Sequence, residues 1–330
     1  MRVLVLGGTR FIGRAIVEDL VAAGHDVTVV HRGEREPDDM PHATHIHLPR
    51  QRWAAESAQF AAAAPDAAVD CLALSRDDAR AAIAAIPGGV HVVALSSQDV
   101  YRAFASLNAA RDTDAVPIDE TSPLSEDRHP HRGHGAEHEL YSKQDVEEEY
   151  LRRGAVVLRL PATYGEHDYQ RREEFILRRA RARRRRIPIG GAGFLWTRGW
   201  VRDIARGVRL AAEHGEIQGD VVNLGEERTC TIRLWAMRIL EVARSDAELI
   251  EVADDVLPAD MSLSSGRLSQ HVLVSTARAR ALLGYTDSDG MTALRSSVGW
   301  HLNHPPDDAD TDFTADDAAL ARPCPPRRPG

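Results

Sequence analysis

Residues 137–150, EHELYSKQDVEEEY, contain a tyrosine and a lysine that could together transfer a proton. A lysine ammonium beside a tyrosine lowers the pKa of the phenol, which makes it a usable acid or base near neutral pH. Tyr141 precedes Lys143 by only two residues. In a regular helix the two side chains would point about 200° apart, because each residue turns roughly 100°. The pair can work only if the backbone changes conformation between them.

The surrounding residues predict such a change. Ser142 and Asp145 have the spacing of a capping box, which indicates a helix that starts at Ser142. The preceding residues, HPHRGHGAEHEL, include two glycines and favour a loop. Tyr141 then lies just outside the helix, where its phenol can be directed toward Lys143. We therefore expect Tyr141 to be the acid/base, with Glu139, four residues before the lysine, as the second candidate.

The same loop carries four closely spaced histidines, which raises the question of a metal. They are His129, His131, His134 and His138. The loop shows no sign of the rigid geometry that a zinc site needs, so we expect no metal. Contacts with a substrate or with solvent are the expected roles of these side chains.

The first half of the chain predicts the sheet that would position these groups. RVLVL, at residues 2–6, is the short, continuous apolar run expected for a strand buried on both faces of a parallel sheet. Apolar positions then recur every three or four residues up to Gly24, as in a helix. Strand and helix patterns alternate as far as VHVVALSS at 90–97. This alternation predicts an α/β fold with a doubly wound parallel sheet and ligands beyond the carboxyl ends of its strands.

The first of these strand ends carries GGTRFIG, residues 7–13. Gly7 permits a tight turn, Gly13 permits close packing of the helix on the sheet, and the helix N-terminus offers free N–H groups to a pyrophosphate. Arg10 stands where the usual pattern has its middle glycine. The position between the first strand and the first helix favours nucleotide binding over a plain turn.

Composition bounds the function further. The 330 residues suffice for a large core, and 43% hydrophobic with 28% charged residues is typical of a soluble protein. The net charge of −9 argues against non-specific binding of nucleic acid by the whole molecule. Three cysteines without metal-ligand spacing suit a reducing compartment, and no apolar run approaches membrane-spanning length. We expect a cytoplasmic protein without a membrane partner.

A longer segment, VLVLGGTRFIGRAIVEDLVAAGHDVTVVHRG, resembles the extended short-chain dehydrogenase/reductases, the NAD(P)-dependent epimerase/dehydratase family. The likeness is greatest to its atypical branch with a GGTRF(I/L)G loop. VVALSSQDVY, LRLPATYG, WVRDIARGV, VVNLGEE and VSTARARALLGY follow in the family's order. The resemblance implies a Rossmann-type domain over 1–165, to which residues 200–225 return, a smaller α/β substrate lobe mainly over 166–302, and a homodimer in many members. Residues 303–330 are acidic and proline-rich, with few apolar side chains, and predict a disordered tail.

The resemblance also implies how the cofactor binds. A basic residue at the end of the second strand favours the 2′-phosphate of NADP, and an acidic one the ribose of NAD. His31 and Arg32 occupy this position, so we expect NADP, with NAD as the alternative. A solvated Arg32 is the simpler interpretation. The expected cofactor-binding residues are Gly7, Thr9, Arg10, Phe11, Ile12, Gly13, His31, Arg32, Leu72, Ala73, Lys143, Pro161 and Thr163.

By the same resemblance, Ser97 would orient the substrate oxygen, Tyr141 would transfer its proton and Lys143 would hold the cofactor ribose. Ser97 could instead bond only to loop backbone. Dehydratases of the family carry an Asp-Glu pair where this chain has Gln98 and Asp99, and the lost carboxylate weakens dehydration. The expected substrate-binding residues are Gln98, Asp99, Tyr164 and Arg198.

Residues 171–186, RREEFILRRARARRRR, contain nine arginines. A solvated basic helix face, a site for the diphosphate of a sugar nucleotide, and an RNA contact are the alternatives. Two functions follow. The first is an NAD(P)-dependent oxidoreductase or epimerase that moves a hydride between nicotinamide and a carbonyl or alcohol carbon of a sugar-nucleotide-like metabolite. The alternative is a non-catalytic NAD(P)-binding protein with an RNA-binding or regulatory role.

Overall fold

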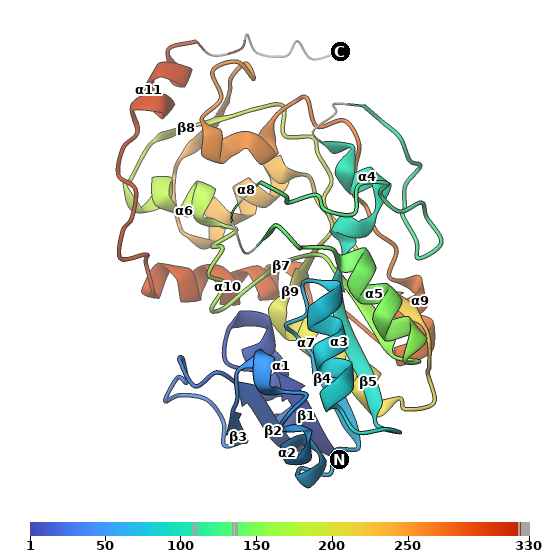
Figure 1. Cartoon of the computed structure of the whole chain (residues 1–330). Helices are drawn as coiled ribbons and strands as arrows, with labels where there is room; N and C mark the ends of the chain where they lie inside the picture. Colours follow the sequence, from blue (N-terminus) through green and yellow to red (C-terminus); the bar gives the residue numbers. More distant parts are fainter. Residues whose placement is uncertain (108–110, 134, 136–137, 323, 325–330) are drawn as a thin grey trace.

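The structure, a computed structural model, describes residues 1–107, 111–133, 135, 138–322 and 324 (Figure 1). Its centre is a seven-stranded sheet in the order β10-β6-β5-β4-β1-β2-β3, in which all pairs are parallel. The strands are β1 (Arg2–Leu6), β2 (Asp26–His31), β3 (Thr44–His47), β4 (Ala67–Asp70), β5 (His91–Ser97), β6 (Val156–Leu160) and β10 (Val221–Asn223). This confirms the predicted doubly wound parallel sheet.

Helices cover both faces of the sheet, which explains the unbroken apolar runs of its strands. Successive side chains of a strand point to opposite faces. Val3 and Val5 pack with helices α1 (Phe11–Ala22) and α7 (Val201–Glu213). Leu4 and Leu6 pack on the other face, with α3 (Arg76–Ala85) and α5 (Lys143–Arg152). Because β10 follows α7, the chain returns from the second lobe to the sheet there.

The second lobe has its own apolar core. In this lobe α8 (Ile232–Val242) packs against α6 (Glu174–Arg181) and α10 (Gly290–Asn303). The lobe also holds the parallel pair β8 (Arg186–Ile189) and β11 (Glu248–Glu251), with β8 on the side opposite α10 (Figure 1). A second parallel pair, β7 (Ala162–Tyr164) and β9 (Arg198–Trp200), lies where the lobes meet. The remaining helices are α2 (Ser57–Ala62), α4 (Arg102–Ala105), α9 (Ala277–Leu283) and α11 (Thr314–Leu320). Within the described residues, no helix combines the length and the apolar character needed to cross a bilayer.

The prediction of disorder from residue 303 onward is wrong for Thr314–Leu320, which form α11. Asp316 of this helix pairs with Arg179 of α6 at 2.6 Å, and both side chains are fully buried. Arg179 also contacts Asp260 at 2.7 Å. A shared buried arginine therefore holds a segment that has too few apolar residues to dock by hydrophobic burial alone.

Candidate active site

The loop between β1 and α1 has the close packing of a phosphate-binding loop. Gly7 has φ +86°, which favours glycine. A Cβ on Gly13 would lie 2.0 Å from the Gly7 carbonyl oxygen, so a larger residue does not fit. Arg10 is the N-cap of α1, and its side chain makes no capping hydrogen bond. The N–H groups of the first helical turn are therefore free to bind an anion, and the loop fits a dinucleotide pyrophosphate.

The segment after β4 borders this loop. The side chain of Leu72 lies so close to Gly7 that a Cβ there would be 2.3 Å from Leu72 Cγ. The Leu72 and Ala73 N–H groups donate to Asp70 Oδ1 at 2.7 and 3.2 Å. Lys143 Nζ donates to the Ala73 carbonyl oxygen at 2.7 Å. Lys143 is thus fixed at the end of the sheet that carries the glycine loop.

The predicted change of backbone before Lys143 is present. Helix α5 begins at Lys143, and its N-cap Ser142 accepts a hydrogen bond from the Asp145 N–H at 3.2 Å. Tyr141 therefore lies outside the helix, which confirms that part of the prediction. Its phenol donates a 2.6 Å hydrogen bond to Asp99 Oδ2, just beyond β5. Lys143 Nζ, in contrast, donates to backbone carbonyls, the second being that of Leu95 at 2.9 Å.

The electrostatics of Tyr141 differ from the prediction that Lys143 lowers its pKa. Burial raises the pKa of Tyr141 well above its ordinary value, and the Asp99 charge and hydrogen bond raise it further, while a hydrogen bond with Ser97 opposes them. Burial also lowers the pKa of Lys143, against the effect of nearby carboxylates that include Asp70 and Asp99. In this arrangement Tyr141 keeps its proton and Asp99 is the acceptor.

Three histidines of the preceding loop, His129, His131 and His138, lie close to Tyr141. His131 Nε2 lies 3.3 Å from the same Asp99 oxygen, and the His131 ring meets the Tyr141 ring edge-on at 4.8 Å. The hydrogen bond to Asp99 raises the pKa of His131, although burial opposes it. His129 Nδ1 lies 3.1 Å from the Tyr141 carbonyl oxygen, and the His138 ring is 6.5 Å from the tyrosine ring. The link between His131 and Asp99 was not predicted from the sequence, and His134 is outside the described residues.

The second candidate base, Glu139, is exposed and accepts a hydrogen bond from the Gly133 N–H at 2.9 Å. The structure therefore ties its carboxylate to its own loop rather than bringing it to Asp99.

Ser97 ends β5, and its Oγ accepts a hydrogen bond from the Asp99 N–H at 3.2 Å. It satisfies loop backbone, as the simpler interpretation held, and also adjoins Tyr141. Gln98, expected to bind substrate, is buried, and its amide donates to the Leu224 carbonyl oxygen at 2.8 Å. Gln98 thus connects β5 to the chain beyond β10 through its amide nitrogen, while its Oε1 is buried without a hydrogen-bond partner among the described residues.

The two other expected substrate residues lie on the strand pair between the lobes. Arg198 is buried over the Trp235 ring at 4.8 Å, and its Nη2 donates to the Cys230 carbonyl oxygen at 3.0 Å. Its Nη1 is buried without a hydrogen-bond partner among the described residues. The Tyr164 ring meets Trp235 at 6.2 Å. Arg198 therefore keeps one donor to offer to a ligand.

Pro161 and Thr163 lie in the segment that follows β6. Thr163 Oγ1 donates to the Pro161 carbonyl oxygen at 3.2 Å, and the Thr163 carbonyl accepts a 2.7 Å hydrogen bond from Arg172 Nε. Arg172 is the one member of the arginine run found at this expected cofactor segment. The arginine pattern in the sequence does not distinguish Arg172 from its neighbours.

Arg10 and Arg32, the basic residues expected near a 2′-phosphate, are both exposed. Arg10 stacks on the Tyr169 ring at 4.8 Å, and Phe11 meets the same ring at 6.2 Å. Arg32 and Glu34 form an exposed pair at 2.9 Å. Such a pair contributes little stability, so Arg32 can turn toward a phosphate at small cost.

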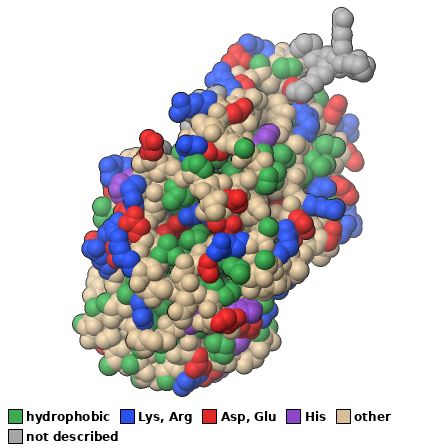
Figure 2. Space-filling model, turned by 90° about the vertical axis from the view of Figure 1, so that its right-hand side faces the viewer, with side chains coloured by type: hydrophobic (Ala, Val, Ile, Leu, Met, Phe, Trp, Pro, Cys, Tyr) green, Lys and Arg blue, Asp and Glu red, His purple; other side chains and the backbone are tan. Residues whose placement is uncertain are grey.

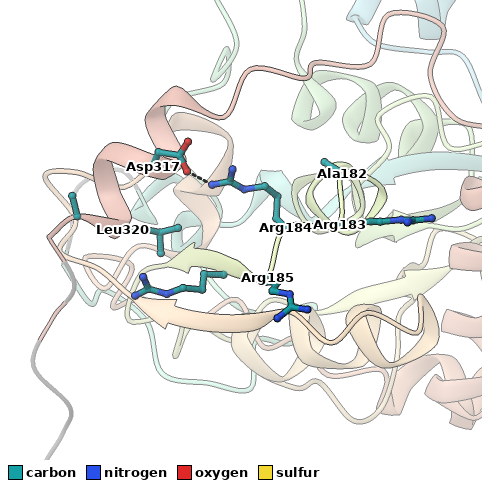
Figure 3. A pocket seen from close by; sticks show the side chains of 8 residues that line it. Ala182, Arg183, Arg184, Arg185, Asp317 and Leu320 are labelled. Carbon is teal, nitrogen blue, oxygen red and sulfur yellow. Dashed lines mark hydrogen bonds and ion pairs between the residues drawn. The ribbon is translucent and has the colours of Figure 1, made fainter.

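Much of the arginine run is used inside the molecule. Besides Arg179, three of its members form ion pairs with acidic residues: Arg178 with Asp260 and Asp310, Arg181 with Glu174, and Arg184 with Asp317 of α11. Arg171 bonds a backbone carbonyl. In Figure 3 Arg184 points to Asp317 across a hollow of about 620 Å³ that α11 borders. On the face in Figure 2, cationic and anionic side chains are interspersed. Part of the run thus docks the C-terminal segment, which weakens the sequence-based reason for an RNA contact, while Arg183, Arg185 and Arg186 remain exposed.

Comparison with known proteins agrees with this geometry. Residues 3–225 match the model of the NAD dependent epimerase/dehydratase family. No curated protein matches the chain. A UDP-glucose 4-epimerase from Thermotoga maritima, solved with UDP-glucose, is 18% identical with a TM-score of 0.68, over 93% of this chain and 100% of that one.

Two further solved structures are similar over most of their length. A UDP-glucose 4-epimerase from Stenotrophomonas maltophila, with NAD and formylated UDP-arabinopyranose, is 16% identical with a TM-score of 0.70, over 92% of this chain and 98% of that one. A dTDP-glucose 4,6-dehydratase from Bacillus anthracis, in complex with NAD, is 14% identical with a TM-score of 0.68, over 92% of this chain and 97% of that one. At these identities the likeness shows a shared fold.

Proposed function

The chain belongs to the NAD dependent epimerase/dehydratase family, and we propose that it is an NADP(H)-dependent oxidoreductase or epimerase that acts on a sugar nucleotide. The observation that carries this proposal is the convergence of Ser97, Asp99 and Tyr141 at the carboxyl end of β5. Lys143 links this end to the segment that borders the glycine loop. Proton-transfer groups and a pyrophosphate site therefore share one edge of the sheet.

The bound nicotinamide would supply the hydride chemistry. In the direction of oxidation, the substrate hydroxyl gives its proton to the Tyr141 oxygen as the C–H bond breaks and the C=O bond forms. The Tyr141 proton moves at the same time along the 2.6 Å hydrogen bond to Asp99 Oδ2. His131, which is half-buried beside Asp99, connects this carboxylate to solvent. Reduction runs the same proton path in reverse.

Lys143 has a positioning role in this scheme. Its ammonium is buried and held by the carbonyl oxygens of Ala73, in the segment after β4, and Leu95, on β5. Three donors are available on an ammonium, so one remains for a ribose hydroxyl.

Of the reactions that the family carries out, dehydration fits this site least well. Loss of water needs a separate acid and base on the substrate. Gln98 stands in one of the two positions and bonds to the Leu224 carbonyl, and Asp99, in the other, bonds to Tyr141. This favours reduction or epimerisation over dehydration.

A phosphate-bearing substrate fits the second lobe. The unpartnered Nη1 of the buried Arg198 is a donor that a diphosphate oxygen would satisfy. The structures similar to this chain include complexes with UDP-glucose and a UDP-arabinopyranose derivative. The unpartnered Arg198 donor and these similar structures both support a nucleotide sugar as the substrate class.

NADP is the proposed cofactor because the end of β2 has His31 and Arg32 and no carboxylate. Arg32 is exposed and restrained only by a surface pair with Glu34. The 2′-phosphate would compete with that carboxylate for the guanidinium.

The test is a titration of the purified protein with NADPH and NADH by tryptophan fluorescence, followed by a screen of UDP- and dTDP-sugars. A reductase changes the nicotinamide absorbance steadily, whereas an epimerase converts the sugar without a net change, which chromatography of the products detects. We expect NADPH to bind more tightly and one nucleotide sugar to turn over. RNA retention that is lost in salt, without turnover of any sugar, would support the non-catalytic alternative instead.

A further inference from the structure

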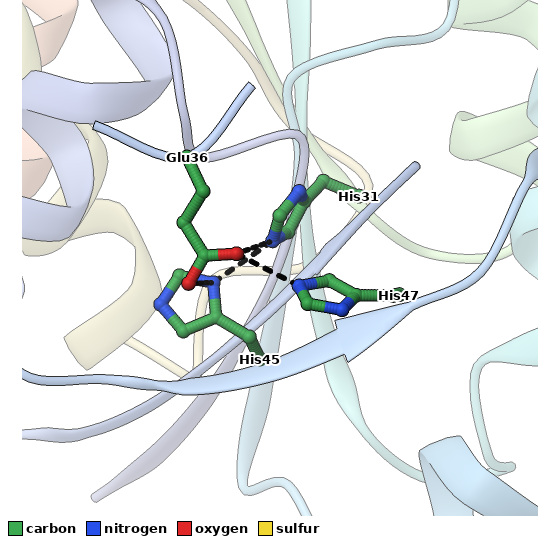
Figure 4. Close-up of side chains that lie close together, drawn as sticks. All are labelled: His31, Glu36, His45 and His47. Atoms are coloured by element: carbon green, nitrogen blue, oxygen red, sulfur yellow. Dashed lines mark hydrogen bonds and ion pairs between the residues drawn. The ribbon is translucent and has the colours of Figure 1, made fainter. Parts of the chain in front are cut away.

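Three histidines of β2 and β3 and one glutamate of the loop between these strands converge at the edge of the sheet. His31 Nε2 lies 2.8 Å from His45 Nδ1, and His47 Nε2 lies 2.8 Å from Glu36 Oε2. The other Glu36 oxygen is 3.6 Å from His45 Nδ1. All four ligand atoms lie within 4.8 Å of one another. Figure 4 shows the Glu36 carboxylate directed at the ring nitrogens.

The fold sets up this cluster. His45 and His47 are two residues apart on β3, so their side chains share one face of the sheet. His31 ends β2 and is the register partner of His47. Gly33 has φ +80°, and a Cβ there would lie 3.3 Å from the His47 ring, so the glycine lets the loop that carries Glu36 pass close to the strand.

The dimensions match a metal site. In tetrahedral coordination by nitrogen and oxygen at about 2.0–2.2 Å, ligand atoms stand roughly 3.4 Å apart. The contacts made by Glu36 and the three rings, 2.8–3.7 Å, bracket this separation. Three imidazoles and one carboxylate are a donor set for zinc and similar divalent transition ions rather than for calcium or magnesium, which take oxygen ligands.

We propose that His31, Glu36, His45 and His47 form a binding site for a divalent transition metal of the Zn²⁺ class. This cluster is separate from the histidines around Tyr141, for which the sequence predicts no metal. This inference requires neither cofactor nor turnover, although His31 belongs both to this cluster and to the end of β2 on which the choice of NADP rests.

His31 would join the metal with a change of proton position. The Gly33 N–H donates to His31 Nδ1 at 3.2 Å, so in the neutral ring the proton sits on Nε2 and is donated to His45 Nδ1. Metal binding at Nε2 moves this proton to Nδ1 or to solvent, and in the first case the Gly33 bond is given up. Glu36, His45 and His47 are therefore the principal ligands, and His31 completes the set.

The experiment uses untagged full-length protein that has been stripped with a chelator and titrated with Co²⁺. We expect one equivalent to bind with the intense visible absorption of tetrahedral cobalt, and Zn²⁺ to displace it. His47→Ala and Glu36→Gln should each weaken binding by about 100-fold or more, because the loss of even an outer partner of a metal ligand costs 10- to 100-fold. Both side chains are substantially exposed, so these variants keep the fold.

His214→Ala is the matched control, because His214 also pairs with a carboxylate, Glu216 at 2.6 Å, but lies outside the cluster. It should bind cobalt like the wild type. Zn²⁺ should also raise the thermal midpoint of the wild type and of His214→Ala but not that of His47→Ala. Failure of the wild type to bind an equivalent of Co²⁺, or equal binding by wild type and His47→Ala, overturns the proposal.

Discussion

The Tyr141 phenol and the Asp99 carboxylate are joined by a 2.6 Å hydrogen bond across 42 residues of sequence. Burial and this carboxylate hold the pKa of the phenol well above its ordinary value. Substrate oxidation needs Tyr141 to release its proton as it accepts another, and Asp99 is the group placed to take it. The pair thus replaces the predicted Tyr141–Lys143 relay as the centre of the site.

The first prediction concerns Asp99→Asn. The substitution removes a negative charge beside the phenol, so the pKa of Tyr141 should fall, while burial keeps it above the ordinary value. Tyrosinate absorbance measured against pH, with the Asp99→Asn/Tyr141→Phe double variant subtracted, isolates this titration. Turnover should fall at least about tenfold, because the proton acceptor is lost. A Tyr141 titration that does not move would disconnect the two residues.

The second prediction concerns the glycine loop. Gly13→Ala places a methyl group 2.0 Å from the Gly7 carbonyl oxygen, so α1 must shift. We expect destabilisation of about 1–3 kcal/mol in urea unfolding, as for overpacked sites, and loss of cofactor binding. Gly299→Ala, in the interior of α10 with open space around it, is the control and should be neutral or stabilising by up to about 1 kcal/mol. Normal NADPH binding by Gly13→Ala would contradict the role assigned to the loop.

The third prediction concerns cofactor choice. Arg32→Ala should weaken NADPH binding about tenfold, the effect of one lost charge-assisted hydrogen bond, and leave NADH binding unchanged. Arg35→Ala removes an exposed arginine of the same loop and serves as the control. If both cofactors lose affinity equally, Arg32 does not read the 2′-phosphate.

The fourth prediction concerns the C-terminal helix. Asp316→Ala leaves the buried Arg179 with Asp260 as its remaining carboxylate partner, and we expect destabilisation of about 3 kcal/mol, in the range for a broken buried pair. Asp317→Ala, which breaks the neighbouring exposed pair with Arg184, should barely shift the unfolding midpoint. Equal midpoints for the two variants would show that α11 is held in some other way.

Most of the fold could be predicted from short-range patterns in the sequence. The apolar run of β1, the glycine loop and the Ser142–Asp145 capping box each depend on residues a few positions apart, and all three are present as predicted. A helix begins where its capping residue satisfies free N–H groups, so the position of Tyr141 outside α5 could be read directly from sequence.

The contacts that the sequence did not reveal are between distant segments. Asp99 could not be matched to Tyr141, nor Arg179 to Asp316 at 137 residues' separation, because tertiary packing chooses among many carboxylates. The sequence contains only a weak indication of the proposed metal site: two histidines lie two residues apart on one strand, and a third ends the strand before it. Only the strand register shows that the three rings meet.

The most direct test of the central claim is the turnover of Tyr141→Phe on the sugar nucleotide found for the wild type, at saturating NADPH or NADP. We expect turnover to fall at least about 100-fold, because the proton-transfer group is gone, and cofactor affinity to stay unchanged. Tyr285→Phe, which removes another buried hydroxyl bonded to the Gly225 carbonyl, should keep its activity. A Tyr141→Phe variant that turns over at the wild-type rate would contradict the assignment of Tyr141 as the acid/base.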